Sequence, residues 1–180
     1  RAVIAGQVTA NASVDVDKIA RDTIREIGYV STDLGFDDKT CQISIHLDRQ
    51  SPDIAQGVNE GEGLYQEMGA GDQGMMFGYA CRETDVLMPL PIMLSRLLME
   101  RLSEVREKKI LPYLRPDGKS QVTVEYLNHV PLRVDTIVVS AQHDENVPYQ
   151  KIQSDIMKEV IEKVIPRHLV DSKTIYHVNP

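Results

Sequence analysis

Two polar segments in the first half of the chain carry residue types that could hold a small charged ligand. Gln50, in the segment Arg49-Gln-Ser-Pro-Asp-Ile-Ala-Gln-Gly57, offers both a donor and an acceptor, which suits a zwitterion or an amide. In Gly69-Ala-Gly-Asp-Gln-Gly74, glycines on both sides of Asp72 let the backbone bend, so the carboxylate could face an amine or a ribose hydroxyl. Each pattern also has a plainer interpretation, because Ser51-Pro52-Asp53 favours a turn and glycine-flanked aspartates are common in turns.

A third segment, Leu114-Arg-Pro-Asp-Gly-Lys-Ser-Gln121, places an acid and a base close together. Asp117 and Lys119 flank Gly118, and the lysine ammonium is a point charge suited to phosphate. The plainer interpretation is a turn at Pro116-Asp117-Gly118 with an exposed lysine, and the segment taken alone favours that turn.

Other residues that often act in catalysis or metal binding have no supporting pattern here. The histidines show neither a metal-ligand spacing nor a hydrolase motif. They are His46, His129, His143, His168 and His177. Cys41 and Cys81 fit neither a disulfide framework nor a metal-binding spacing, so both are expected to be reduced packing residues.

Composition narrows the class of protein further. The formal charge of −7 and the lack of a Lys/Arg block argue against nucleic acid as a partner, because binding to a phosphate backbone needs clustered cations. No apolar run approaches the roughly 20 residues that span a bilayer, so we expect no membrane segment and a cytoplasmic location. With 42% apolar residues in 180, the chain can bury a core.

The elements that must position these residues begin with a strand, a helix and a second strand. Residues 2–9 are rich in β-branched side chains, and residues 41–47 alternate apolar with polar side chains, as half-buried strands do. Between them a helix is expected from an N-cap at Asp15 to a left-handed cap at Gly28. Its apolar stripe is Ile19, Ala20, Thr23, Ile24 and Ile27.

The middle of the chain, residues 48–88, is glycine-rich and lacks a periodic apolar pattern. Loops of this length are uncommon in compact domains unless they bind ligands or form lids, so a functional loop is favoured over plain flexible chain. A helix is expected at residues 92–108, with its apolar face at Leu94, Leu97, Leu98, Leu102 and Val105.

The last part of the chain predicts a hairpin, a helix and a short strand. Strands are expected at 121–127 and 132–142, joined at Asn128-His129, and a helix at 149–164 precedes a strand at 174–178. The first and last thirds share this order at an offset of 133 positions, which pairs Ile43 with Tyr176. We therefore predict a duplicated α+β unit with helices on one face of each sheet, the alternative being coincidence between two ordinary units.

Together the polar segments resemble, in order and spacing, the S-adenosylmethionine synthases. The matching segments are Arg25-Glu-Ile-Gly-Tyr29, Gln50-Ser-Pro-Asp-Ile, Gly69-Ala-Gly-Asp-Gln-Gly-Met-Met-Phe-Gly-Tyr-Ala80, Glu83-Thr-Asp, Met88-Pro and Leu114-Arg-Pro-Asp-Gly-Lys-Ser-Gln-Val-Thr123. The resemblance implies two-layer, intertwined repeats of β-α-β-β-α-β type. It also implies a homodimer or homotetramer. The implied domains are an N-terminal remainder at 1–50, a mobile active-site loop or linker at 51–68 and a central domain at 69–180.

The family's site residues can be carried over by position. Gln50 matches a methionine-contacting glutamine, and Asp72 matches an aspartate beside methionine and adenosine. Asp117, Gly118 and Lys119 match the ATP-contacting residues, with the lysine towards the phosphates. Gln7 stands where many members have a methionine-contacting glutamate. The mobile loop of the family corresponds to Gln50, Ser51, Pro52, Asp53, Ile54, Ala55, Gln56 and Gly57.

The resemblance implies an enzyme that forms S-adenosylmethionine from ATP and L-methionine and releases pyrophosphate and phosphate. The enzyme uses Mg²⁺ and K⁺, and the ligands of both ions are expected outside these 180 residues. The catalytic histidine, which belongs to a His-Pro-Asp-Lys motif, is expected outside them as well. No catalytic residue and no metal ligand is therefore assigned within the chain, which is expected to be inactive by itself. The alternatives are a non-catalytic regulatory relative of the same fold, for which Gln7 is the support, and a free-standing nucleotide-binding module.

Overall fold

The computed structural model describes residues 1–69, 71 and 74–180. The chain divides into two compact units, Arg1–Phe77 and Gly78–Pro180. Asp72, a predicted contact of methionine and ATP, lies outside the described residues.

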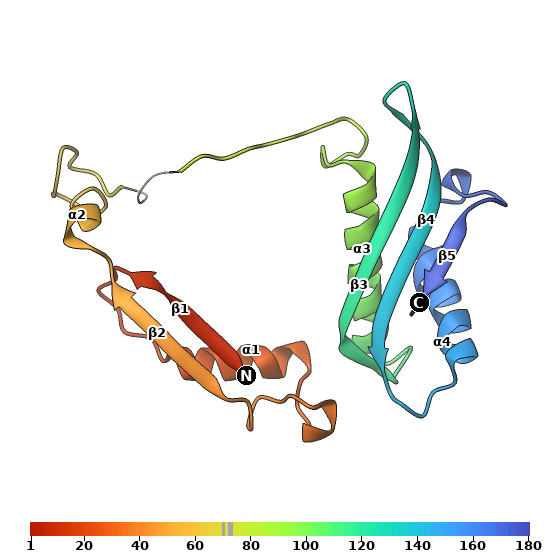
Figure 1. The fold of residues 1–180 in the computed structure, drawn as a ribbon, viewed down its shortest axis with the longest axis horizontal. Coiled ribbons are helices and arrows are strands. Elements are labelled where there is room, and N and C mark those ends of the chain that lie inside the picture. Colours follow the sequence, from red (N-terminus) through yellow and green to blue (C-terminus); the bar gives the residue numbers. More distant parts are fainter. Residues whose placement is uncertain (70, 72–73) are drawn as a thin grey trace. The chain divides into compact units, whose positions relative to one another are not determined.

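The first unit is built around a parallel pair of strands. Its elements are β1 (Ala2–Val8), α1 (Val16–Ile27), a 3₁₀ turn (Thr32–Leu34), β2 (Ile43–Arg49) and α2 (Pro52–Ala55) (Figure 1). The strands pair in register from Ala2 opposite Ile43 to Val8 opposite Arg49. A parallel pair needs a crossover connection, and α1 supplies it. The predicted strand–helix–strand order is confirmed, although β2 begins two residues after Cys41.

Local sequence explains where α1 begins and ends. The Asp15 carboxylate accepts a hydrogen bond from the Lys18 backbone N–H at 3.0 Å, which satisfies one of the donors left open by the first turn. Gly28 ends the helix with φ at 111°, a left-handed conformation that glycine adopts without a steric penalty. Both predicted caps are confirmed. None of the twelve residues of α1 is fully buried, and Ile19 is 54% exposed.

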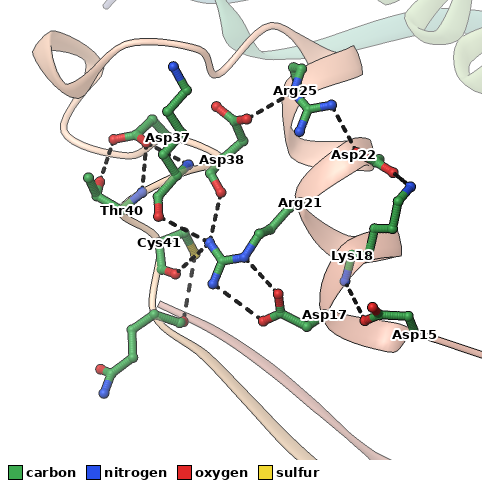
Figure 2. Close-up of polar contacts among 12 residues, drawn as sticks. Asp15, Asp17, Lys18, Arg21, Asp22, Arg25, Asp37, Asp38, Thr40 and Cys41 are labelled. Atoms are coloured by element: carbon green, nitrogen blue, oxygen red, sulfur yellow. Dashed lines mark hydrogen bonds and ion pairs between the residues drawn. The ribbon is translucent and has the colours of Figure 1, made fainter.

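An arginine ties the loop after α1 back to the helix. The Arg21 guanidinium forms an ion pair with Asp17 and donates from Nη1 to the backbone carbonyls of Asp38, Lys39 and Cys41 at 2.8, 3.2 and 3.2 Å (Figure 2). One turn later, Arg25 donates to the buried carboxylate of Asp38 at 2.9 Å. The planar guanidinium can serve several acceptors at once, so two arginines fix the path of the chain into β2.

The turn at residues 37–41 is closed by a buried aspartate. Asp37 Oδ1 accepts hydrogen bonds from the backbone N–H groups of Lys39 and Thr40 at 2.7 and 2.8 Å. Its Oδ2 accepts from the Thr40 hydroxyl, and Figure 2 shows all three bonds converging on one side chain. These hydrogen bonds, the one from the Thr40 hydroxyl first, hold the pKa of Asp37 below its ordinary range. Cys41 follows directly and is buried, as predicted for a packing residue.

The second unit is a three-stranded sheet with its long helices packed against it. Its elements are α3 (Leu90–Glu107), β3 (Leu114–Leu127), β4 (Val130–His143), α4 (Tyr149–Ile156), a π-helical turn (Met157–Ile161), α5 (Glu162–Val164), a 3₁₀ turn (Arg167–Leu169) and β5 (Ile175–Val178). The strand order is β3-β4-β5, antiparallel for the first pair and parallel for the second (Figure 1).

Most of the apolar face predicted at residues 92–108 and one face of α4 form the core of this unit. Leu94, Leu98, Leu102 and Val105 of α3 are buried, as are Ile152 and Ile156 of α4. They pack with four buried residues of β4, of which the last three alternate along the strand: Val134, Ile137, Val139 and Ala141. This is the three-to-four-residue period of a helix meeting the two-residue period of a strand.

The hairpin between β3 and β4 is confirmed, and its strands are longer than predicted. Asn128 and His129 have φ values of 51° and 64°, the two positive angles of the turn type that matches the twist of a two-residue hairpin. The alternative of a turn at Pro116-Asp117-Gly118 is wrong, because these residues lie within β3. An irregularity in pairing between Leu114 and Gly118 accommodates Pro116, which has no N–H to donate to the ladder.

The predicted α+β fold class is confirmed, and the duplicated layout appears in the strand connections. In each unit two parallel strands are joined through a helix, β1 to β2 through α1 and β4 to β5 through the α4 segment. Ile43 and Tyr176, aligned by the sequence offset, both lie in the second strand of their pair.

None of the helices in the described part of the chain is long and apolar enough to cross a bilayer.

Replacing Leu98 with alanine is expected to destabilise the second unit by roughly 2–5 kcal/mol, because the side chain is fully buried and its removal leaves a cavity under the sheet. Urea unfolding followed by circular dichroism measures the change. Leu127→Ala is the matched control, since Leu127 is 60% exposed at the hairpin and should lose less than about 0.5 kcal/mol. If both variants lost the same free energy of unfolding, Leu98 would not be a core residue.

The Asp37 turn is expected to open in acid. A carboxyl whose pKa is lower in the folded state stabilises the fold above its unfolded-state pKa of about 4, and this contribution is lost as the pH falls through the folded pKa. Exchange of the Lys39 and Thr40 amides, corrected for intrinsic rates, should therefore accelerate below about pH 4. In Asp37→Asn the exchange should be fast already at neutral pH and depend less on pH. Asp53→Asn, at an exposed position of the same unit, should leave both amides unchanged.

Candidate ligand-binding site

The predicted ATP-contacting residues line a cavity of about 330 Å³ in the second unit. It lies where β3 and β4 run side by side, next to the residues that follow β5. Its walls are Asp117, Gly118, Lys119, Ser140, Ala141, Gln142, Asn179 and Pro180. The structure therefore brings all three of the predicted nucleotide residues of β3 together with polar residues of β4.

The direction of these side chains follows from the packing of α3 beneath Gly118. A Cβ at Gly118 would lie 2.6 Å from Leu102 Cδ2, so this position faces the helix at close range. Gly118 pairs with Ala141, which is also buried against the helix side. Because side chains alternate along a strand, Asp117 and Lys119 point to the other face. Glycine at this position therefore lets helix and strand approach and turns its two charged neighbours away from the core.

Four polar side chains of the cavity form no interaction with the described residues. Neither a hydrogen bond nor an ion pair is formed by the side chains of Asp117, Lys119, Ser140 or Gln142 within the described ranges. Lys119 and Ser140 are directly opposite each other in the ladder. The contrast is with Arg115, earlier in β3, which forms an ion pair with Asp144 at 2.9 Å. The uncommitted groups can be used by a ligand without breaking an existing contact.

One wall of the cavity is held rigidly by Asn179. Its Oδ1 accepts from the Ala141 N–H at 2.8 Å and its Nδ2 donates to the Ala141 carbonyl at 3.0 Å. Its own N–H donates to the Val139 carbonyl at 3.0 Å. Asn179 has φ at 46°, a left-handed conformation that asparagine tolerates better than most residues. Through these bonds Asn179 continues the hydrogen-bonding pattern along the edge of β4 and is fixed against that strand.

Sequence reasoning missed the contributions of Ser140, Gln142 and Asn179 to this cavity. A signal was present for the first two, because polar residues alternate with the buried apolar residues Val139 and Ala141 on this strand. That alternation marks side chains on the face opposite the core. Asn179 had no such signal, since its role depends on where β5 ends beside β4.

The segment that precedes α3 is anchored by a carboxylate. Glu83 Oε2 accepts hydrogen bonds from the Leu90 backbone N–H at 2.8 Å, at the first turn of α3, and from the Tyr126 hydroxyl at 2.7 Å. These two bonds lower the pKa of Glu83, the backbone bond most, while burial and then the Glu83 contact raise the pKa of Tyr126. The carboxylate therefore connects the start of α3 to the far end of β3 and helps fix the helix against the sheet.

The predicted methionine residue Gln50 lines a separate cavity of about 410 Å³ within the first unit. Its walls are Val8, Thr9, Ala10, Asn11, Arg49, Gln50, Pro52, Ala55, Asn59 and Glu62. The Thr9 hydroxyl donates to Gln50 Oε1 at 3.2 Å and orients the carboxamide. The cavity lies past the carboxyl ends of two parallel strands, a common position for ligand sites in sheets with helical crossovers.

The other predicted residues of this unit are placed differently. Gln7 lies in β1 opposite Asp48, is exposed and is not among the residues that line the Gln50 cavity. In the predicted loop, Pro52–Ala55 form the short helix α2, with hydrogen bonds from Ala55 N to Ser51 O and from Gln56 N to Pro52 O at 2.8 and 3.1 Å. The alternative of a turn at Ser51-Pro52-Asp53 thus becomes the first turn of a helix, with Pro at a position where its missing N–H is not needed.

The described residues do not provide a complete metal site. No group of three or more His, Cys, Asp or Glu side chains within residues 1–69, 71 and 74–180 is close enough to hold an ion. Asp117 is the one carboxylate of the second-unit cavity. One carboxylate is too few for the oxygen ligands by which a protein holds Mg²⁺ without a bound substrate.

Two family models match the chain and together cover most of it. The model described as "S-adenosylmethionine synthetase, N-terminal domain" matches residues 1–52, and the model described as "S-adenosylmethionine synthetase, central domain" matches residues 67–180. The second match contains the cavity of Asp117 and Lys119, and the first contains Gln7 and Gln50.

Curated relatives resemble the chain along its whole length. The S-adenosylmethionine synthase of Desulfosudis oleivorans is 56% identical over 179 residues, which is 99% of this chain and 46% of that protein. The S-adenosylmethionine synthase of Syntrophobacter fumaroxidans is 55% identical over 178 residues, again 99% of this chain and 46% of the relative. The chain therefore spans about half the length of the curated relatives it matches.

Replacing Lys119 with methionine is expected to weaken binding of inorganic tripolyphosphate about tenfold, because a charge-assisted hydrogen bond contributes roughly 1.5–3 kcal/mol. Titration calorimetry at low and high salt measures the effect, which should shrink as salt screens the ammonium. Lys158→Met is the matched control, since that side chain is 75% exposed in the turn after α4. If Lys119→Met bound tripolyphosphate as tightly as the wild type does, Lys119 would not be an anion-binding residue.

Proposed function

The chain belongs to the S-adenosylmethionine synthetase family, and we propose that it is part of an enzyme that forms S-adenosylmethionine from ATP and L-methionine. Pyrophosphate and phosphate are the other products of the proposed reaction. Within this proposal, residues 1–50 belong to an N-terminal domain, 51–68 to a mobile active-site loop and 69–180 to a central domain. The whole protein is proposed to be a cytoplasmic homodimer or homotetramer.

The observation that supports this function best is the set of uncommitted polar groups on one face of the β3–β4 ladder. Lys119 offers an ammonium and Asp117 a carboxylate in a cavity whose walls are held by Asn179 and by the helix beneath Gly118. A nucleotide presents an anion to the lysine and hydroxyl or amino donors to the carboxylate. The cavity therefore suits ATP, which has both an anionic group and hydrogen-bond donors, better than a ligand that has only one of the two.

In the proposed reaction the methionine sulfur attacks C5′ of the ATP ribose, and the whole triphosphate leaves. Negative charge builds up on the leaving group, so a fixed cation beside it lowers the barrier. Lys119 is the residue of this chain proposed for that role. Placing the sulfur in line with C5′ is a positioning task, for which Gln50, Asp72 and Gln7 are proposed on the methionine side.

Gln50 and Gln7 differ in how well the structure supports these roles. Gln50 is oriented by Thr9 at the edge of a cavity, and a loop that begins there could exclude water from a bound substrate. Gln7 can hydrogen-bond an ammonium group but supplies no negative charge. Gln7 also supports the second candidate, a regulatory relative of the same fold that binds these ligands without converting them.

Mg²⁺ and K⁺ are implied by the family and belong to the proposal for the whole protein. Because the described residues lack a grouped ligand set, no step is assigned here to either ion. One lysine does not neutralise the charge of a triphosphate leaving group. For this reason we propose that the chain has no activity by itself.

The full-length protein that contains this chain should form S-adenosylmethionine only when both ATP and methionine are supplied. Mass spectrometry of the product and a phosphate assay measure the two sides of the reaction. The isolated chain, purified free of host enzyme, should form none. Product from the isolated chain would contradict its proposed inactivity, whereas a full-length protein that binds both ligands without turnover would favour the regulatory relative.

A further inference from the structure

A third cavity, of about 330 Å³, lies in the second unit beside the helical segment that follows α4. It shares no residue with the cavity of Lys119 or with that of Gln50. Its walls are Met157, Ile161, Glu162, Ile165, Arg167, Val170 and Tyr176. Small-molecule sites have volumes of roughly 300–1,000 Å³, so this cavity is large enough for a small ligand.

An irregular stretch of helix forms one side of this cavity. Met157–Ile161 is the π-helical turn, after which the Glu162 N–H donates to the Met157 carbonyl five residues back. Such turns are rare and occur frequently at functional sites. The chain then passes Pro166 and the 3₁₀ turn and returns to β5, where Tyr176 closes the cavity. The hollow therefore forms where a widened helix and the return to the sheet meet.

The floor of the cavity is apolar. Ile161 and Ile165 are buried, and Met157, Val170 and Tyr176 are partly buried against the core of the unit. The methionine side chain is flexible and polarizable, so it adapts to contacts of different shape. The floor is thus a surface that an apolar group of a ligand can cover without displacing the core.

The polar groups around this floor are uncommitted. Among the described residues, the side chains of Glu162, Arg167 and Tyr176 form neither a hydrogen bond nor an ion pair. The charges of Glu162 and Arg167 are opposite, and both side chains are exposed. Burial raises the pKa of Tyr176, and the charge of Glu162 raises it further, since both groups line one cavity. A partly buried tyrosine hydroxyl usually has a hydrogen-bond partner, and no described residue supplies one here.

The two charges select the kind of ligand. The Arg167 guanidinium can hold a carboxylate through two parallel hydrogen bonds, and the Glu162 carboxylate accepts hydrogen bonds from an ammonium group. A fatty acid would bring no positive charge to Glu162, and a simple amine would bring no negative charge to Arg167. A nucleotide would be repelled by Glu162 and by the nearby Asp171. A zwitterion with an apolar side chain uses both charges and the floor.

We propose that this cavity binds a free amino acid with an apolar side chain. Arg167 holds its carboxylate, Glu162 holds its ammonium group, and its side chain lies on Met157 and Ile161. The site shares no residue with those proposed for ATP and methionine, so it is separate from the proposed function.

Methyl NMR of the full-length protein, labelled at the methionine methyl groups, locates the binding. The probe is L-leucine. The Met157 signal, identified through Met157→Leu, should shift and saturate at millimolar leucine, because this side chain lines the cavity. A Met157 signal that does not move would overturn the proposal, even if leucine bound elsewhere in the protein.

Two analogues of leucine test the two charges in the wild type. Isocaproate lacks the ammonium group, and isoamylamine lacks the carboxylate. Each should bind about tenfold more weakly than leucine, because each loses a charge-assisted hydrogen bond. If either analogue bound as tightly as leucine does, the ligand would not be a zwitterion and the proposal would fail.

Substitutions connect each charge of the ligand to one side chain. Arg167→Met should abolish the preference for leucine over isoamylamine, and Glu162→Gln should abolish the preference for leucine over isocaproate. Both side chains are exposed, so neither variant removes a core contact. Lys158→Met and Glu145→Gln are the matched controls, because they remove exposed charges outside the cavity and should keep both preferences.

The variants also separate this inference from the proposed function. If Arg167→Met and Glu162→Gln kept the preferences of the wild type, other groups would bind the amino acid and the proposal would be overturned. Formation of S-adenosylmethionine by the full-length protein is measured independently, so that result would leave the proposed enzymatic function unaffected.

Discussion

The apolar stripe of α3 packs closely on the helix-facing side of the β3–β4 ladder, and the direction of the polar side chains on the other side near Gly118 follows from that contact. Gly118 lies directly above Leu102, where a Cβ would come within 2.6 Å of the leucine. Two-residue alternation then turns Asp117 and Lys119 outward on β3, and Ser140 outward on β4. A core contact between apolar groups thus arranges a set of polar groups that never touch the core.

The two units are stabilised by different interactions. The second buries continuous apolar surface from both long helices and the sheet, which is the dominant favourable term in folding. The first has a two-stranded sheet and a helix without a fully buried residue, and relies on Arg21, Arg25 and Asp37 to fix the connection between helix and strand. Polar networks of this kind specify geometry well but contribute less free energy than a core.

Much of the fold was predictable because its signals are local. The caps of α1 at Asp15 and Gly28, the apolar period of α3 and the hairpin turn at Asn128-His129 each lie within a few residues of the structure they specify. The turn predicted at Pro116-Asp117-Gly118 failed for the opposite reason. Proline, aspartate and glycine favour a turn locally, but pairing with β4 and packing against Leu102 place them in a strand, and these contacts come from distant parts of the sequence.

The sequence by itself determined most element types, the α+β class and which functional groups Gln50, Asp117 and Lys119 carry, because residue type and short-range spacing carry that information. Only the tertiary structure decided that Ser140, Gln142 and Asn179 share a cavity with Lys119, that Gln50 is oriented by Thr9 and that Gln7 does not line the cavity of Gln50. These relations depend on strand register and on where one strand ends beside another. Register is set by long-range pairing and by burial of one face, which no short segment encodes.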